Sequence, residues 1–227
     1  MSIAENIAAI RREIAGVSDH PVTLVAATKM NDASRVREAV AAGVDACGEN
    51  RVQEFLEKDS QGAYEGAPRH FIGHLQKNKV KKIVGRVDLI QSVDSVELLR
   101  LIHKCAMELG IVQDVLIEIS IAGEKQKSGV APETLPEMLE AAGNLSNIRV
   151  RGLMCVPPVS RFSGQNNTYF AAMRQLFIDN SEKKYDNVSM DFLSMGMTDD
   201  YKDAIAQGAN MVRIGSAIFG ARDYGGK

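Results

Sequence analysis

The stretch Val22-Thr-Leu-Val-Ala-Ala-Thr-Lys-Met-Asn31 sets an apolar run directly before a lysine. Its first six residues alternate little between apolar and polar types, which is typical of a strand covered on both faces in a parallel sheet. The turn that follows, Thr28 to Asn31, lacks the GxGxxG pattern that admits a pyrophosphate in doubly wound, Rossmann-like sheets. A closed parallel barrel is therefore favoured over that open α/β fold.

Strand-like and helix-like segments alternate along the rest of the chain. We expect strands at residues 22–27, 45–47, 69–72, 87–91, 115–120, 148–154, 188–193 and 210–214. Eight parallel strands joined by right-handed crossovers suit closure into a barrel. Before the first strand, isoleucines fall on one helical stripe at positions 3, 7, 10 and 14. We predict a single α/β domain over residues 1–227, a (β/α)8 TIM-like barrel with an extra N-terminal helix.

Two helix beginnings can also be predicted. Asn31 or Asp32 should cap a helix that ends near Gly43. Further along, Asp94 and Glu97 have the spacing of a capping box, in which the first side chain accepts from the backbone of the fourth residue.

Composition limits the classes of partner. Lys and Arg number 27 against 29 Asp and Glu, so a net charge of −2 gives no large field to attract nucleic acid or anionic lipid. The three cysteines, Cys47, Cys105 and Cys155, are far apart and include no CxxC pair, which argues against a disulfide framework and a zinc site. No apolar run approaches the ~20 residues that cross a bilayer. We expect a cytoplasmic protein with no metal, nucleic acid or membrane partner.

Lys29 is the first candidate for chemistry. It follows the first strand, so it should lie at the carboxyl end of the barrel, where barrel enzymes keep their active sites. A lysine at a strand end can also simply raise its ammonium group to solvent. A chemical role needs desolvation that lowers the usual pKa of about 10.4, because only the neutral amine attacks an aldehyde.

Two glycine-containing loops are candidates for holding a phosphate. Leu193-Ser-Met-Gly-Met-Thr-Asp199 follows the seventh strand, and Arg213-Ile-Gly-Ser-Ala-Ile-Phe-Gly220 includes the end of the eighth. Small residues let the backbone approach a ligand, and N–H groups at the start of a helix face an anion. Loops after strands seven and eight are the usual phosphate site of barrels. Gly196 and Gly215 could instead only make tight turns.

Several longer motifs carry a family resemblance that runs from about Val22 to Gly220. They are Val25-Ala-Ala-Thr-Lys29, Gly48-Glu-Asn-Arg-Val-Gln-Glu54, His70-Phe-Ile-Gly-His-Leu-Gln-Lys-Asn-Lys79, Leu193-Ser-Met-Gly-Met197 and Arg213-Ile-Gly-Ser-Ala-Ile-Phe-Gly220. Together, and in this order, they resemble the pyridoxal phosphate homeostasis proteins. Thr28, Thr198 and Ser216 depart from the residues usual in that family but keep the hydroxyl groups.

The resemblance implies a barrel like the N-terminal domain of alanine racemase and a role for particular residues. Lys29 would be the lysine that forms a Schiff base with pyridoxal 5′-phosphate. The phosphate would be held by Ser194, Gly215 and Ser216. Arg213 would face the pyridine nitrogen, and Asn50 would line the ring pocket. His74 is a weaker candidate, since a histidine in such a loop is as often structural.

The same residues indicate which chemistry to expect. Arginine keeps its proton, so Arg213 can donate to the ring nitrogen but cannot protonate it, which weakens the ring as an electron sink. A two-base racemase needs a second proton-transfer group, which alanine racemases take from a tyrosine of an additional β domain. Only seven residues follow Gly220, so we expect that domain to be absent.

We therefore expect a cofactor-binding protein rather than an enzyme. It would hold pyridoxal 5′-phosphate as a Schiff base, release it to apo enzymes or to the free pool, and act as a monomer in intracellular homeostasis of the cofactor. One alternative is a pyridoxal phosphate-dependent amino-acid racemase. The other is a phosphate-binding barrel in which Lys29 serves a different carbonyl compound, as an aldolase lysine does.

Overall fold

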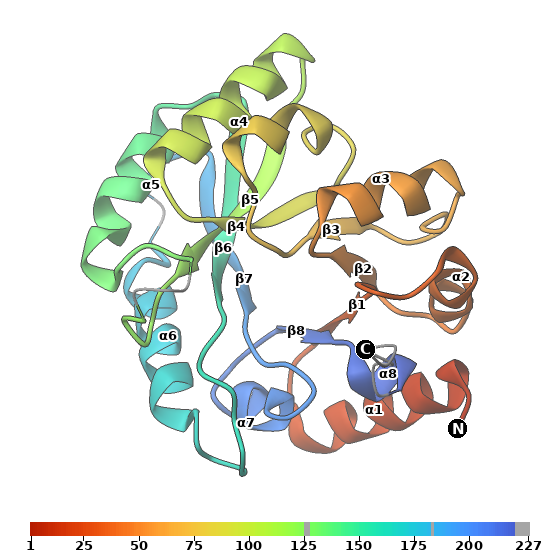
Figure 1. The fold of residues 1–227 in the computed structure, drawn as a ribbon. Coiled ribbons are helices and arrows are strands. Elements are labelled where there is room, and N and C mark those ends of the chain that lie inside the picture. The colour runs from red at the N-terminus through yellow and green to blue at the C-terminus, as the bar shows by residue number, and fades with distance from the viewer. Residues whose placement is uncertain (125–127, 183, 221–227) are drawn as a thin grey trace.

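The computed structural model describes residues 1–124, 128–182 and 184–220. Eight parallel strands close into a barrel in their sequence order, with β8 paired to β1 (Figure 1). The strands are β1 (Thr23–Ala27), β2 (Ala46–Glu49), β3 (Arg69–Phe71), β4 (Leu89–Val93), β5 (Gln113–Ile119), β6 (Ile148–Cys155), β7 (Val188–Ser194) and β8 (Met211–Ile214). The predicted eight-stranded barrel is confirmed, and each predicted strand end lies within two residues of the observed one.

Helices surround the barrel and connect its strands (Figure 1). They are α1 (Ile3–Val17), α2 (Ala33–Ala41), α3 (Val52–Ser60), α4 (Val96–Glu108), α5 (Leu135–Gly143), α6 (Asn167–Asp179), α7 (Tyr201–Ala206) and α8 (Ser216–Phe219), with two short 3₁₀ helices, η1 (Lys77–Lys82) and η2 (Pro132–Thr134). No helix in the described parts of the chain is long and apolar enough to cross a membrane. The single domain over residues 1–227 stays a prediction, and residues 221–227 lie outside the described ones.

The extra N-terminal helix is present as α1. Its isoleucine stripe is buried, and the helix packs against α2, α7 and α8. Ser2 and Glu5 form a capping box at its start, which satisfies backbone donors that have no partner inside the helix. Asn6 Nδ2 donates to Ile218 O at 2.9 Å, so α1 also holds the short helix α8 that follows β8.

The two predicted helix beginnings have different outcomes. Asp32 caps α2, because its side chain accepts from Arg35 N. The capping box at Asp94 is wrong: Ser95 caps α4 by accepting from Leu98 N. The Asp94 carboxylate instead lies 3.2 Å from His74 Nδ1. Asp94 and Ser95 are adjacent, and either could have capped the helix. The Asp94 side chain contacts His74 instead, so Ser95 forms the cap.

The barrel interior is divided into two layers. An apolar layer contains Val25, Ala46, Leu89, Leu116, Met154 and Met211. Side chains two positions apart on a strand face the same side of the sheet. On three of these strands, the residue two positions further along is polar: Gln91, Glu118 and Arg213. These polar side chains are buried and nearer the carboxyl ends of the strands. The fold therefore presents polar chemistry at one end of a closed apolar barrel.

Candidate functional site

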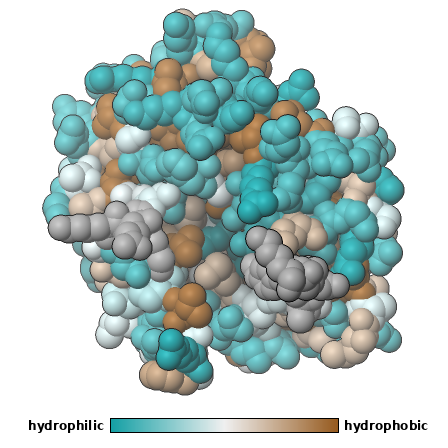
Figure 2. Space-filling view, in the orientation of Figure 1, coloured by the Kyte–Doolittle hydropathy of each residue, from teal (hydrophilic) through white to brown (hydrophobic). Residues whose placement is uncertain are grey.

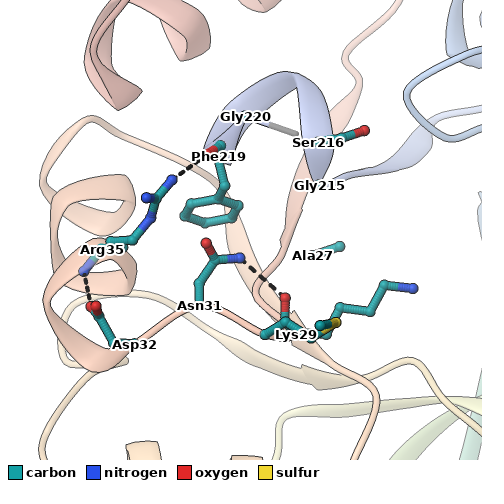
Figure 3. Close-up of a pocket in the computed structure, with 10 residues that line it drawn as sticks. Ala27, Lys29, Asn31, Asp32, Arg35, Gly215, Ser216, Phe219 and Gly220 are labelled. Carbon is teal, nitrogen blue, oxygen red and sulfur yellow. Dashed lines mark hydrogen bonds between the residues drawn. The ribbon is translucent and has the colours of Figure 1, made fainter. Parts of the chain in front are cut away.

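Lys29 lies directly after β1, next to the turn between β8 and α8. Figure 3 shows its side chain extending away from Arg35 and Asp32, toward the side on which the Ser216 hydroxyl lies. Lys29, Gly215 and Ser216 line one cavity of about 280 Å³. The structure thus brings Lys29 and two residues of the predicted phosphate cradle to the lining of one cavity.

Gly215 permits this approach of β8 to β1. A Cβ atom at this position would lie 3.3 Å from the carbonyl oxygen of Ala27 and 3.4 Å from its Cβ. Any larger residue would therefore crowd the backbone that leads into Lys29. At Gly196, in the loop after β7, the need is stricter: φ is +92° and a Cβ would lie 2.6 Å from the Cβ of Ala204.

Two hydroxyl groups meet at the start of α8. Ser216 Oγ donates to Thr198 Oγ1 at 3.1 Å, and the backbone N–H of Ala217 donates to the same oxygen at 3.5 Å. Thr198 was not among the expected site residues. The sequence does show a hydroxyl residue at this position, in the glycine-containing loop that begins at Leu193, and this could have indicated a phosphate-binding role.

Ser194 lies elsewhere, in a hydrogen-bonded chain across the barrel interior. Arg213 Nη1 donates to Ser194 Oγ at 2.5 Å, and Ser194 Oγ donates to Gln91 Oε1 at 2.7 Å. Gln91 Nε2 lies 2.9 Å from His70 Nδ1. Ser194 is fully buried, and its hydroxyl is used by these two neighbours. The structure therefore places it with Arg213 rather than with Ser216.

Arg213 is a buried cation. Its side chain is held by Ser194 and by the carbonyl oxygen of Cys155, which accepts from Nη2 at 2.8 Å. Both of these acceptors are neutral. Burial lowers the pKa of Arg213 from its ordinary value, although an arginine keeps its proton in proteins. A buried guanidinium held by neutral oxygens is suited to meet a polar or anionic ligand.

Two other buried groups in the barrel have shifted pKa values. Burial lowers the pKa of His70 to about 4, so this imidazole is neutral at pH 7. Burial, with a smaller contribution from the charge of Asp94, raises the pKa of Glu118 to about 7, while Arg213 acts in the opposite direction. Glu118 was not among the site residues expected from the sequence. An acidic residue inside an otherwise apolar strand was the feature of the sequence that could have indicated a role for it.

Asn50 follows β2 and has a buried acceptor. Its backbone N–H donates to Glu49 Oε1 at 2.8 Å. Its side-chain Oδ1 is buried and has no hydrogen-bond partner among the described residues. Gly73 packs tightly behind it, since a Cβ there would lie 2.2 Å from Asn50 O. An unpaired buried acceptor is uncommon in native proteins and fits a position that receives a ligand donor.

His74 lies on an exposed part of the same end. Its Nδ1 is 3.2 Å from Asp94 Oδ2 and 3.3 Å from Ser128 Oγ, and 57% of its side chain is exposed. Among the residues that the structure describes, no three His, Cys, Asp or Glu side chains gather as a metal site would require.

Figure 2 shows a mostly hydrophilic face with scattered hydrophobic residues in this view.

Comparison with known proteins first defines the class. The family profile described as alanine racemase, N-terminal domain, matches residues 1–223. A solved alanine racemase from Clostridium difficile shares the fold, with a TM-score of 0.73 and 18% identity, over 97% of this chain and 58% of that one. The chain is therefore a barrel of the alanine racemase N-terminal type.

Nearer relatives then give the family. Pyridoxal phosphate homeostasis proteins from Aquifex aeolicus and Pseudomonas aeruginosa are 43% and 40% identical, covering 93% and 99% of this chain and 92% and 97% of their own lengths. The chain belongs to the pyridoxal phosphate homeostasis protein family, which confirms the resemblance seen in the sequence. The structure of PipY from Synechococcus elongatus, described with PLP bound, has a TM-score of 0.85 and 32% identity over 96% of this chain and 100% of that chain.

Proposed function

We propose that this chain holds pyridoxal 5′-phosphate covalently through Lys29 and serves intracellular homeostasis of that cofactor without turning over a substrate. The observation that carries the proposal is the placement of Lys29 beside Gly215 and Ser216, lining one cavity at the carboxyl end of the barrel. The names of the relatives and the cofactor bound in PipY support the choice of ligand.

The residues present fit this cofactor, with one change to the expected set. Gly215 and Ser216 would hold the phosphate, and Thr198 joins them because its hydroxyl bonds to that of Ser216. Ser194 was expected to bind phosphate, but its contacts support a different role, in which it orients Arg213.

The remaining two positions fit the ring of the cofactor. Asn50 offers an unpaired buried acceptor, which a ligand donor would satisfy. Arg213 offers guanidinium donors that would meet the ring nitrogen. Both roles follow the resemblance and are compatible with the observed burial of each group.

When bound, pyridoxal phosphate supplies an aldehyde for linkage to an amine and a ring that can accept electrons. The chain's own groups favour holding over turnover. Arg213 donates hydrogen bonds but cannot give up a proton, so it would leave the ring nitrogen unprotonated. Release would then need only an amine that displaces Lys29, by which the cofactor passes to apo enzymes or to the pool.

The test is an absorbance spectrum with and without borohydride. After incubation with pyridoxal 5′-phosphate, the protein should absorb in the near-visible range, and reduction should fix the cofactor mass to the peptide that contains Lys29. Lys29→Ala should abolish the fixed mass, while Lys81→Ala, in an exposed surface ion pair with Glu108, should not. A protein that stays colourless, or that fixes a different carbonyl compound as an aldolase lysine would, contradicts the proposal.

One observation favours amino-acid racemase as the second candidate. Glu118 is a buried acid whose pKa of about 7 suits proton transfer at neutral pH. Racemase activity would exchange the α-proton of an amino acid in deuterated water. Rapid exchange that depends on both Lys29 and Glu118 would replace the carrier proposal.

We also propose a monomer located in the cytoplasm. The cysteines Cys47, Cys105 and Cys155 are free and buried, which suits a reducing compartment. Light scattering of the purified protein tests the oligomeric state, and a mass of two chains would contradict the monomer.

A further inference from the structure

A buried ion pair lies behind the segment that carries Lys29. Lys58 Nζ, from α3, is 2.6 Å from Glu49 Oε2, at the end of β2. Only 7% and 1% of these two side chains are exposed. Taking two charges out of water is expensive, and such pairs often stabilise a protein no better than apolar residues of similar volume. Stability alone is therefore a poor explanation for this pair.

The ion pair holds the peptide unit that precedes Lys29. Lys58 Nζ donates to the carbonyl oxygen of Thr28 at 2.8 Å. The Thr28 hydroxyl donates to Glu49 Oε2 at 3.0 Å, so the same carboxylate oxygen receives both donors. Thr28 itself is fully buried. The carbonyl direction just before Lys29 is thus set by a buried cation that is itself held in place.

A second carboxylate holds the peptide unit that follows Lys29. Met30 N donates to Glu54 Oε2 at 2.8 Å, and this oxygen lies 3.5 Å from Lys58 Nζ. Met30 has a φ of 62°, in the left-handed region that a residue with a side chain seldom adopts. Asn31 Nδ2 also donates to Lys29 O at 3.1 Å. The turn is therefore kept in an unfavourable conformation by its hydrogen bonds.

These contacts have a stereochemical consequence. Each peptide unit is planar, so the orientations of the two units that flank Lys29 fix its φ and ψ, and with them the direction of its Cα–Cβ bond. Glu49 acts on the cofactor-binding set a second time, because its other oxygen accepts from Asn50 N at 2.8 Å. One buried carboxylate thus sets the backbone at two of the proposed site residues.

We propose that Lys58, together with Glu49 and Glu54, is a positioning group that aims the Lys29 amine at the cofactor aldehyde. This inference rests on the proposed function and adds to it a set of residues that do not themselves touch the cofactor. Displacing a reacting group by about 1 Å can slow a reaction by roughly 100-fold. The network should therefore affect the rate of covalent linkage more than the affinity for the cofactor.

The first experiment compares Lys58→Met with Lys81→Met, a matched lysine in an ion pair whose side chain is 74% exposed. Linkage to pyridoxal 5′-phosphate should be at least about 10-fold slower in Lys58→Met, in line with the sensitivity of reactions to misplacement. Binding of pyridoxine 5′-phosphate, an alcohol that cannot link, should change less than about threefold, because the phosphate cradle is intact. Lys81→Met should behave like the unchanged protein in both assays.

Hydrogen exchange without the cofactor gives an independent measure. The Met30 amide should exchange about 10-fold faster in Lys58→Met, because Glu54 loses the cation that helps to hold it. If the unchanged protein does not link pyridoxal 5′-phosphate, the proposed function fails, whereas faster exchange would still show that Lys58 holds this backbone. If linkage and exchange are both unaltered in Lys58→Met, the positioning inference alone fails.

A double variant separates positioning from stability. Lys58→Met with Glu49→Leu removes both buried charges, so the melting temperature should recover from the loss in Lys58→Met. Linkage should stay slow in the double variant, and its return to the original rate would overturn the inference. Should Lys58→Met fail to fold, Glu54→Gln provides the same test at the Met30 amide, and unchanged linkage with unchanged exchange there would contradict the proposal.

Discussion

The two layers inside the barrel lie one above the other on the same strands but are composed differently. The layer nearer the amino ends consists of apolar side chains such as Leu116 and Met211. The layer nearer the carboxyl ends contains Gln91, Glu118 and Arg213, all buried. Burying ionisable groups destabilises a protein unless they are well paired. The contrast indicates that the first layer stabilises the barrel and that the second is kept for ligand binding.

The largest effect should come from creating a cavity in the apolar layer. Leu116 is completely buried, and Leu116→Ala should lower the free energy of unfolding by about 2–5 kcal/mol, because it removes packed atoms and leaves a cavity. Urea denaturation measures the loss. Cofactor binding by the folded protein should stay within about twofold of normal. Weakened binding with unchanged stability would reverse the assignment of the two layers.

The pH dependence of the unfolding free energy should show how far the buried Glu118 in the polar layer destabilises the fold. The folded-state pKa of Glu118, about 7, lies above its ordinary value of 4.5. The contribution of this group to stability is therefore full below pH 4.5 and is lost as the pH rises through 7. Glu118→Gln should match the unchanged protein near pH 4 and exceed its stability by about 3 kcal/mol at pH 8.

The quantity to compare is the difference in unfolding free energy between Glu118→Gln and the unchanged protein at each pH. His70 also makes stability depend on pH, in the opposite direction, and its effect cancels in this difference. Its folded-state pKa of about 4 lies below the ordinary 6.5, so its contribution is present above pH 6.5 and lost as the pH falls. Glu57→Gln, at an exposed glutamate, is the control and should follow the unchanged protein at every pH. If the difference in stability between the two proteins does not grow between pH 4 and pH 8, the raised pKa of Glu118 is wrong.

Removing the buried cation should affect binding more than stability. Arg213→Met should weaken pyridoxal 5′-phosphate binding by about 2 kcal/mol, or roughly 30-fold, since it deletes a charge-assisted hydrogen bond to the ligand. Stability should change by less than about 1.5 kcal/mol, because relief from burying a charge offsets the lost bonds to Ser194 and Cys155. Calorimetric titration and urea denaturation check the two values. A stability loss like that of Leu116→Ala with unaltered affinity would contradict this view.

The smallest effect concerns the phosphate cradle. Thr198→Val should weaken pyridoxal 5′-phosphate binding by about 1 kcal/mol, or roughly fivefold, through loss of one hydroxyl. Thr198→Ser keeps the hydroxyl and should bind normally. Pyridoxal, which has no phosphate, should bind equally to all three proteins. An equal loss for both ligands would show that Thr198 supports the site without contacting the phosphate.

The site was only partly predictable. Lys29, Gly215 and Ser216 follow strand ends, and position along a parallel barrel is enough to bring such residues to one end. Ser194 also ends a strand, yet its side chain points inside, to Gln91, 103 residues away. The hydroxyl that lies beside Ser216 is that of Thr198, two residues after the glycine turn at Gly196.

Hydrophobic patterning and short connections are local properties of the chain. The order of residues was therefore enough to predict the alternating strands and helices, the closed barrel and Lys29 at the end of β1. Which polar side chains contact one another became visible only in the folded chain. Lys58 reaches the carbonyl of Thr28, 30 residues away, and Arg213 reaches that of Cys155, 58 residues away. Such contacts depend on strand register and on how the helices pack, which no local pattern encodes.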